Sequence, residues 1–282
     1  MSAQKHFLTV KDNSVSKETF ELIFDENLDM LVTSPQPNVI DLGRYYESED
    51  YISHTDGKRS LFEKAYHFIK NIALKNKLSL INNLDNSKGN LLDIGAGTGD
   101  FLLVAKDNGW KSVGIEPSEK ARNSAKSKGV ELKSNLSDFE DNSFDVITMW
   151  HVLEHVPNLE EQIKELKRLL KPNGSIIIAV PNFKSYDANH YKEFWAAYDA
   201  PRHLWHFSKM AIKKLFQKEN LELVKIYPMK FDSFYVSLLS EKYKTGKMNY
   251  IKAFCVGLIS NLKAKKTFEY SSHIYVLKNA KN

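Results

Sequence analysis

The chain has few of the features that cross-link a protein or hold it in a membrane. Its 282 residues contain one cysteine, Cys255, which excludes an internal disulfide and a metal site built from clustered cysteines. It has no apolar run of about 18 residues, so we expect no membrane-spanning helix. The first residues, Met1 to His6, lack the apolar core of a signal peptide. We therefore expect a cytoplasmic protein.

Acidic residues are scarce near the carboxyl terminus. Residues 241–282 contain nine lysines and two glutamates, and the whole chain has a net charge of +5. A lysine-rich run usually forms a solvated surface, and attraction to an anionic partner is the alternative. We expect no nucleic-acid partner, and the oligomeric state stays open.

The most informative stretch runs from Leu91 to Gly99 and reads L-L-D-I-G-A-G-T-G. An apolar run containing Asp93 precedes three glycines, and helix-forming residues follow from Asp100. This pattern predicts a buried strand, a tight turn and the start of a helix. Glycine lets the backbone approach a ligand closely, and the first N–H groups of a helix favour a nucleotide-like ligand.

A second signal lies at the end of the next predicted strand. Glu116 follows Asp93 by 23 positions, and an acid at about this distance can accept both hydroxyls of a ribose. A dinucleotide loop would read G-x-G-x-x-G/A, but the sixth position counted from Gly95 is Asp100. The spacing therefore argues against an NAD(P) oxidoreductase. An acid beside the loop suits a ligand that carries an amino group.

In these residues the chain resembles the class I S-adenosylmethionine (SAM) methyltransferases, within the broad group that shares the D-I-G-x-G-T-G loop. The resemblance runs from about Leu91 to Val180 and extends more loosely to the carboxyl terminus. It implies SAM as the cofactor and an α/β fold with a doubly wound, seven-stranded, mostly parallel Rossmann-like sheet. The motifs specify cofactor and fold, but they say little about the substrate.

The rest of the chain alternates between strand and helix patterns, as such a sheet requires. An amphipathic helix is expected at 58–80, and strands are expected at 91–94, 112–116, 130–133, 144–149, 175–180 and 221–227. Helices are expected at 100–108, from Ser118 to 129, after a capping box of Asn158 and Glu161, and after Ser208. By resemblance, a last strand at 273–277 runs antiparallel between the strands at 175–180 and 221–227.

We expect an N-terminal extension at 1–57 and a SAM-dependent methyltransferase domain at 58–282. Many relatives carry a zinc ribbon with a C-x-x-C-G step in the extension. The corresponding residues 25–29 lack cysteine, so a metal-free hairpin of residues 20–24 and 30–33 is expected, with no zinc. The resemblance places Tyr46 or Tyr51 near the methionine part of SAM, and ordinary aromatic packing is the alternative.

The carboxyl ends of the predicted strands carry the expected cofactor site. The resemblance assigns the methionine part to Asp93 and the loop residues Gly95, Ala96, Gly97 and Gly99. It assigns the ribose hydroxyls to Glu116, the faces of the adenine to Pro117 and Leu136, and the adenine edge to Asn135. Trp150 is expected near the sulfonium or the substrate.

Methyl transfer from a sulfonium mainly requires alignment, although a neutral nucleophile also benefits from a base. His151 directly follows a predicted strand, and a site role and a packing role are equally open. The stretch from Pro201 to Ser208 resembles a P-R-H-L-x-H-F-S segment of one subgroup of these enzymes. His203 and His206 are therefore candidate catalytic residues, and Arg202 is a candidate for gripping an anionic acceptor. A loop pinned by its aromatic residues is the alternative.

We predict a SAM-dependent methyltransferase that acts on oxygen or nitrogen of a small or mid-sized acceptor. The alternative is a regulatory protein that binds SAM without turnover. Residues 232–266 form an apparent helical cap, interpreted as a substrate lid with Phe234, Tyr235 and Phe254 facing the pocket. A helical hairpin packed on the back of the sheet is the alternative to a lid.

Overall fold

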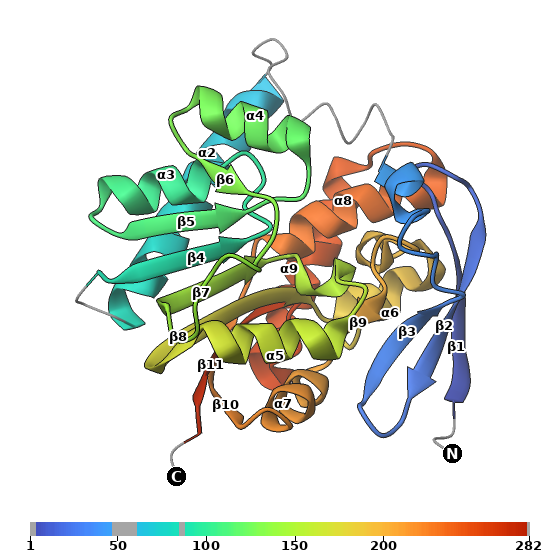
Figure 1. Ribbon diagram of the computed structural model, residues 1–282. Coiled ribbons are helices and arrows are strands. Elements are labelled where there is room, and N and C mark those ends of the chain that lie inside the picture. The colour runs from blue at the N-terminus through green and yellow to red at the C-terminus, as the bar shows by residue number, and fades with distance from the viewer. Residues whose placement is uncertain (1–3, 47–60, 85–87, 281–282) are drawn as a thin grey trace.

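The computed structural model describes residues 4–46, 61–84 and 88–280 (Figure 1). The strands of these ranges form two sheets, and the larger sheet has seven strands in the order β10-β11-β8-β7-β4-β5-β6. Strand β11 runs antiparallel to β8 and β10, whereas β4, β5, β6, β7 and β8 pair in parallel. The expected doubly wound sheet is confirmed, and so is the position of its last strand.

Most element boundaries lie within a few residues of the expected ones. The strands are β4 Asn90–Ile94, β5 Lys111–Ile115, β6 Leu132–Lys133, β7 Phe144–Trp150, β8 Leu170–Pro181, β10 Leu221–Pro228 and β11 Ser272–Asn279. The helices beside them are α2 Leu61–Leu84, α3 Asp100–Asp107, α4 Glu119–Ser127, α5 Leu159–Leu169 and α7 Lys209–Gln217. The expected capping box is wrong: the Asn158 side chain donates to the Glu161 carboxylate at 2.9 Å and accepts no backbone N–H.

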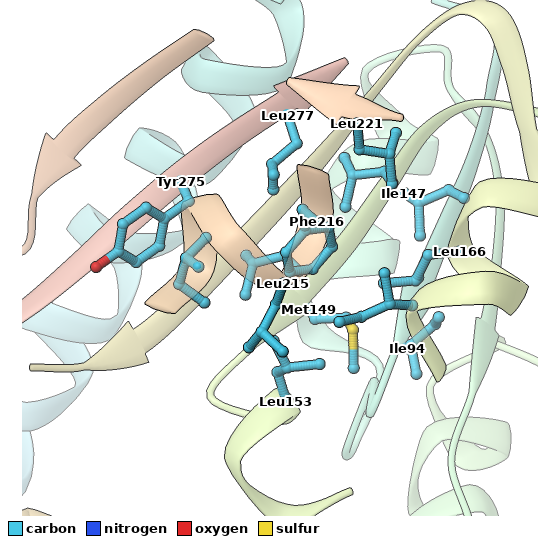
Figure 2. Close-up of a cluster of buried hydrophobic side chains, with 14 of the residues drawn as sticks. Ile94, Ile147, Met149, Leu153, Leu166, Leu215, Phe216, Leu221, Tyr275 and Leu277 are labelled. Atoms are coloured by element: carbon cyan, nitrogen blue, oxygen red, sulfur yellow. The ribbon is translucent and has the colours of Figure 1, made fainter. Parts of the chain in front are cut away.

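Helices cover both faces of the large sheet. On one face, α5 and α7 direct side chains such as Leu166 and Phe216 toward Met149 and Tyr275 of the sheet (Figure 2). On the other face, α2, α3 and α4 bury a cluster that includes Ile81, Leu102, Ala125 and Val146. Burying each large aliphatic side chain contributes about 1.5–3 kcal/mol, so both faces stabilise the frame that carries the site.

The smaller sheet has the order β1-β2-β3-β9 and lies to one side of the large sheet (Figure 1). Its strands are β1 Gln4–Lys11, β2 Thr19–Asp25, β3 Met30–Ser34 and β9 Trp205–His206. The β2–β3 hairpin is confirmed. Strand β1 was not expected from the sequence, and neither was the pairing of β9 with this sheet from a distant part of the chain. The expected boundary at 57/58 and Tyr51 lie outside the described residues.

The segment after β8 contains short helices and a helical hairpin. These are α6 Tyr186–Tyr191, the 3-10 helices η3 Lys192–Phe194 and η4 Ala196–Tyr198, and the long helices α8 Asp232–Thr245 and α9 Tyr250–Thr267. The α8–α9 hairpin packs on α6, and α8 also packs on η3 and η4. Ser260 donates to Asp187 at 2.7 Å, and Ser240 accepts from the Ala196 N–H at 2.9 Å. Within the described ranges, each helix is too short or too polar to span a bilayer.

Candidate functional site

The glycine loop joins β4 to α3, and its glycines are needed for two different reasons. Gly95, Gly97 and Gly99 have φ values of +70°, +55° and +76°, which other residues adopt at a cost in strain. A Cβ on Gly95 would lie 2.3 Å from the Val152 side chain, and one on Gly99 would lie 3.1 Å from Val130. Among the described residues, a Cβ on Gly97 would meet no atom within 4 Å. Internal packing therefore explains Gly95 and Gly99, whereas Gly97 faces open space that a ligand can enter.

Glu116 follows β5 and its carboxylate holds this loop. One oxygen, Oε2, accepts the Gly97 backbone N–H at 2.9 Å, and Oε1 accepts the Ser118 backbone N–H at 2.9 Å. Each carboxylate oxygen can accept a second hydrogen bond. The half-buried side chain is therefore fixed in place beside Gly97 and can still accept from hydroxyl donors.

Asp93 lies in β4 and is almost fully buried. Burial raises the pKa of Asp93 to about 6, although the Thr148 hydroxyl, which donates at 2.6 Å, and the nearby Lys77 favour the carboxylate. Burial lowers the pKa of Lys77, whose Nζ lies 4.4 Å from the ring centre of Trp150. The sequence analysis missed Thr148 and Lys77, because only the packing of α2 and β7 brings them to Asp93.

Asp100 occupies the position where a dinucleotide loop has glycine or alanine. Its carboxylate pairs with Lys70 at 2.6 Å and with Lys128 at 2.8 Å, at the first residue of α3. A negative charge at a helix N-terminus is favourable. Asp100 therefore has a structural role, and its charge is held at the helix end where a dinucleotide pyrophosphate would bind.

The residues expected to bind adenine lie at neighbouring strand ends. The Glu116 N–H donates to the Lys133 carbonyl at 2.9 Å. Pro117 and residues 135–136 therefore follow two neighbouring strands, β5 and β6. Pro117 and Asn135 are exposed, and Leu136 is half-buried against the core. Contacts of these three residues with adenine stay predictions.

The carboxyl end of β7 carries Trp150 and His151. Trp150 packs edge-on against Phe101, with ring centres 5.7 Å apart, and its buried Nε1 has no hydrogen-bond partner in the described parts of the chain. His151 has a φ of +57° and directs Nε2 to Asp232 at 3.2 Å and Nδ1 to Glu154 at 3.4 Å. Asp232 begins α8, so the helical hairpin contributes a side chain to this rim.

Burial disfavours the charged form of His151, but the Asp232 and Glu154 carboxylates outweigh it and raise the pKa to about 10. His151 therefore carries a proton at neutral pH and directs both ring nitrogens toward carboxylates. The His151 side chain is 37% exposed and the Asp232 side chain is 21% exposed, so the pair is reachable from the rim. The sequence analysis gave no signal for Asp232.

Arg202 is placed differently from the expected acceptor anchor. The residue is 3% exposed, and its guanidinium donates to Asp12 at 3.1 Å, to Asp199 at 2.9 Å and to the Tyr45 carbonyl at 2.8 Å. The guanidinium thus binds groups of the protein itself, two of which, Asp12 and Tyr45, belong to the N-terminal segment. The geometry favours a structural role, and contact of Arg202 with an acceptor stays a prediction that no contact here supports.

His203 and His206 are also turned into the protein. The Nδ1 of His203 lies 2.9 Å from the Ala197 carbonyl, and the Nε2 of His206 lies 3.0 Å from the Thr33 hydroxyl. Burial lowers the pKa of His206 to about 3, so this histidine is neutral. Their catalytic roles stay predictions, and the geometry supports the alternative of a segment pinned by its own aromatic residues.

Tyr46 ends the 3-10 helix η1 Leu42–Tyr46, and its hydroxyl lies 3.0 Å from Nδ1 of His155. Its expected role beside the methionine part of SAM stays a prediction. On the hairpin, Phe234 stacks on Phe254 with ring centres 5.4 Å apart. Tyr235 and Phe254 are exposed. The expectation that these three aromatic residues face the pocket also stays a prediction.

The residues at this edge fit a cationic cofactor with a ribose. The space beside Gly97 admits a ligand, and Glu116 offers carboxylate oxygens next to it. The carboxylate of Asp93 lies near the same strand ends, where a ligand with an amino group finds favourable charge. A pyrophosphate would meet repulsion there.

Comparison with known proteins agrees with this geometry. A family model described as a methyltransferase domain matches residues 63–226, which is more than half of the chain. A sterol 4-C-methyltransferase of Caenorhabditis elegans is 34% identical over 116 residues, covering 36% of this chain and 35% of the relative. A ubiquinone biosynthesis O-methyltransferase of Coxiella burnetii is 30% identical over 135 residues, covering 44% and 56% respectively. The chain thus spans about a third to just over half of these curated relatives.

Solved structures share the fold. A possible histamine N-methyltransferase of Thermotoga maritima has a TM-score of 0.52 at 22% identity and covers 76% of this chain and 93% of its own. A phosphoethanolamine N-methyltransferase of Haemonchus contortus in complex with SAM has a TM-score of 0.51 at 18% identity and covers 73% and 53%. With the family match, the glycine loop and Glu116, we conclude that the chain belongs to the methyltransferase-domain family and is an enzyme that uses SAM as its cofactor.

Proposed function

We propose that the enzyme transfers the methyl group of SAM to oxygen or nitrogen of a small or mid-sized acceptor, which enters beside His151 and Asp232. The observation that carries this proposal is the His151–Asp232 pair, with Nε2 and Oδ2 3.2 Å apart. His151 directly follows β7 and Asp232 begins α8, and the two residues meet at the carboxyl end of the sheet, where ligands of such sheets bind.

SAM supplies an activated methyl carbon on a positively charged sulfur. The oxygen or nitrogen lone pair of the acceptor attacks this carbon, the carbon–sulfur bond breaks, and the methylated atom becomes acidic. In the proposed role, the Asp232 carboxylate accepts the proton that this atom loses. His151 acts as a positioning residue, because its protonated ring holds Asp232 and both of its nitrogens already face carboxylates.

The preference for oxygen or nitrogen rests on this pair, because a carbon nucleophile needs activation by a stronger base before it attacks. The names of the curated relatives include methyltransferases for carbon and for oxygen, on sterol and quinone-type molecules. These names support a small-molecule acceptor for this chain. They do not distinguish between carbon, oxygen and nitrogen as the methylated atom, so that choice is argued from the residues of the site.

The test uses a small-molecule cell extract with SAM and the full-length enzyme. We expect metabolites that gain a methyl group on oxygen or nitrogen, located by fragmentation. Asp232→Asn should lower turnover by about 10²–10⁴-fold, the usual effect of losing a general base, with SAM affinity retained. His6→Ala is the matched control, because His6 is exposed in β1 and its ring contacts Thr9 of the same strand. A product methylated on carbon, or full turnover by Asp232→Asn, would contradict the proposal.

A further inference from the structure

A buried cluster of Glu154, His155 and His203 lies behind the rim. Glu154 and His155 belong to the 3-10 helix η2 Leu153–His155, which follows β7, and His203 comes from the segment before β9. One candidate ligand atom of each residue lies within 4.8 Å of those of the other two. The two histidine rings meet edge to face, with centres 4.5 Å apart.

Glu154 is the unusual member of this cluster. The residue is 1% exposed, and in the described parts of the chain neither carboxylate oxygen accepts a hydrogen bond. Glu154 Oε1 lies 3.4 Å from Nδ1 of His151, and the same ring pairs through Nε2 with Asp232 at 3.2 Å. A buried carboxylate without hydrogen bonds is strongly unfavourable unless it is paired or binds a metal.

Arg202 is a further cation on the segment that carries His203, but it does not pair with Glu154. Arg202 already serves two carboxylates, Asp12 and Asp199. Among the described groups, Glu154 therefore depends on a cation that it shares with Asp232.

Both histidines are oriented as metal ligands usually are. His155 directs Nδ1 to the Arg202 carbonyl and the Tyr46 hydroxyl, each at 3.0 Å, and His203 directs Nδ1 to the Ala197 carbonyl at 2.9 Å. A ligating histidine commonly donates one ring N–H to a backbone carbonyl and offers the other nitrogen to the metal.

We propose that Glu154, His155 and His203 form a binding site for one divalent transition-metal ion of the zinc class. Two imidazoles and one carboxylate are a common ligand set for such ions. With metal–ligand bonds of about 2.0–2.2 Å, the three groups would have to draw closer by roughly 1 Å. The ion would neutralise Glu154 and join η2 to the segment that carries Arg202 and β9.

This site differs from the zinc ribbon considered in the sequence analysis. The expectation of no metal followed from the missing cysteines at residues 25–29, and the cluster uses no cysteine. Its histidines are 48 positions apart in the sequence, so they do not form a short metal-binding motif. The proposed site is independent of the methyl acceptor, and it can be tested without measuring turnover.

The experiment uses the full-length chain, stripped with a chelator, incubated with Zn²⁺ and desalted. We expect about one zinc ion per chain by mass spectrometry of the metal content, and tetrahedral ligand-field absorption when Co²⁺ replaces Zn²⁺. Zinc at about 100 times its dissociation constant should raise the melting temperature by roughly 5 °C or more.

Glu154→Gln keeps the shape of the side chain and removes its charge, so it should abolish stoichiometric binding and the thermal shift. His203→Asn should do the same, and His6→Asn is the surface control that should bind normally. Because Glu154→Gln removes a buried charge, it should fold even if His203→Asn does not. Stripped wild-type protein that retains no Zn²⁺ or Co²⁺, or Glu154→Gln that retains as much as wild type, would overturn the proposal.

Discussion

The Glu116 carboxylate accepts the Gly97 backbone N–H at 2.9 Å, so the acid expected to bind ribose also holds the glycine loop. Its other oxygen accepts the Ser118 N–H at the start of α4. One side chain therefore sets the distance between the two segments that would enclose the nucleoside.

The first prediction concerns this carboxylate. Glu116→Ala should weaken SAM binding by about 1.5–3 kcal/mol, the contribution of hydrogen bonds to a charged group. Titration calorimetry measures the change, and the control is Glu119→Ala, which alters an exposed acid in the first turn of α4. NAD should not bind to either protein. Equal SAM affinity of Glu116→Ala and the control would refute the assignment of the site.

The second prediction separates the two kinds of glycine in the loop. Gly97→Val should abolish SAM binding, because its side chain would fill the open space beside the loop, while the protein remains folded. The positive φ makes this change cost about 1–2 kcal/mol of stability. Gly95→Ala should destabilise the fold instead, because its Cβ would meet Val152 at 2.3 Å. Calorimetry and thermal melting of both variants would show whether this separation exists.

The third prediction uses the raised pKa of Asp93. Its pKa is about 6 in the folded state against a reference near 3.8, so the folded protein holds this proton more tightly than the unfolded chain does. The protonated Asp93 therefore adds to the free energy of unfolding. This added stability is complete below the unfolded pKa of 3.8 and is lost as the pH rises through about 6. At about 1.4 kcal/mol per pKa unit, wild type should lose about 2–3 kcal/mol relative to Asp93→Asn between pH 4 and pH 7.

Denaturant unfolding of wild type and Asp93→Asn at several pH values measures this difference. Comparing the two proteins cancels the contributions of the other carboxylates. Thr148→Val should move the loss to higher pH, because it removes the hydroxyl that donates to Asp93 at 2.6 Å. A stability difference that does not change with pH would contradict the account of Asp93.

The fourth prediction tests the structural role of Arg202. Arg202→Met should destabilise the protein by about 3–5 kcal/mol, because it leaves the buried Asp12 and the half-buried Asp199 without their cation. Arg44→Met is the matched control, because Arg44 pairs with Glu18 at the surface and should change stability by no more than about 1 kcal/mol. The folded fraction of Arg202→Met should bind SAM normally. Unchanged stability with loss of acceptor binding would instead favour the role as an acceptor anchor.

The sequence indicated the parts of the site that local patterns specify. The loop from Asp93 to Gly99, the acid at Glu116 and the alternation of strands and helices each have a short-range signature, and the structure contains all three. The β2–β3 hairpin was also predictable, because two apolar runs flank a polar turn.

The sequence did not indicate contacts between distant segments. Arg202 and Asp12 are 190 positions apart, and β9 reaches the N-terminal sheet only through the tertiary fold. The pairing of His151 with Asp232 likewise depends on where α8 packs. Arg202, His203 and His206 stood out because charged and aromatic residues cluster there, but burial decides whether such a cluster faces a ligand or the interior.

The most direct test of the account is transfer of a deuterated methyl group from labelled SAM to small molecules of a cell extract. Wild-type enzyme should produce at least one labelled metabolite with the label on oxygen or nitrogen, together with S-adenosylhomocysteine. Glu116→Ala should produce far less at a SAM concentration near the wild-type dissociation constant, and Asp232→Asn should produce little even at saturation. Absence of labelled product with wild type, or equal labelling by all three proteins, would contradict the account.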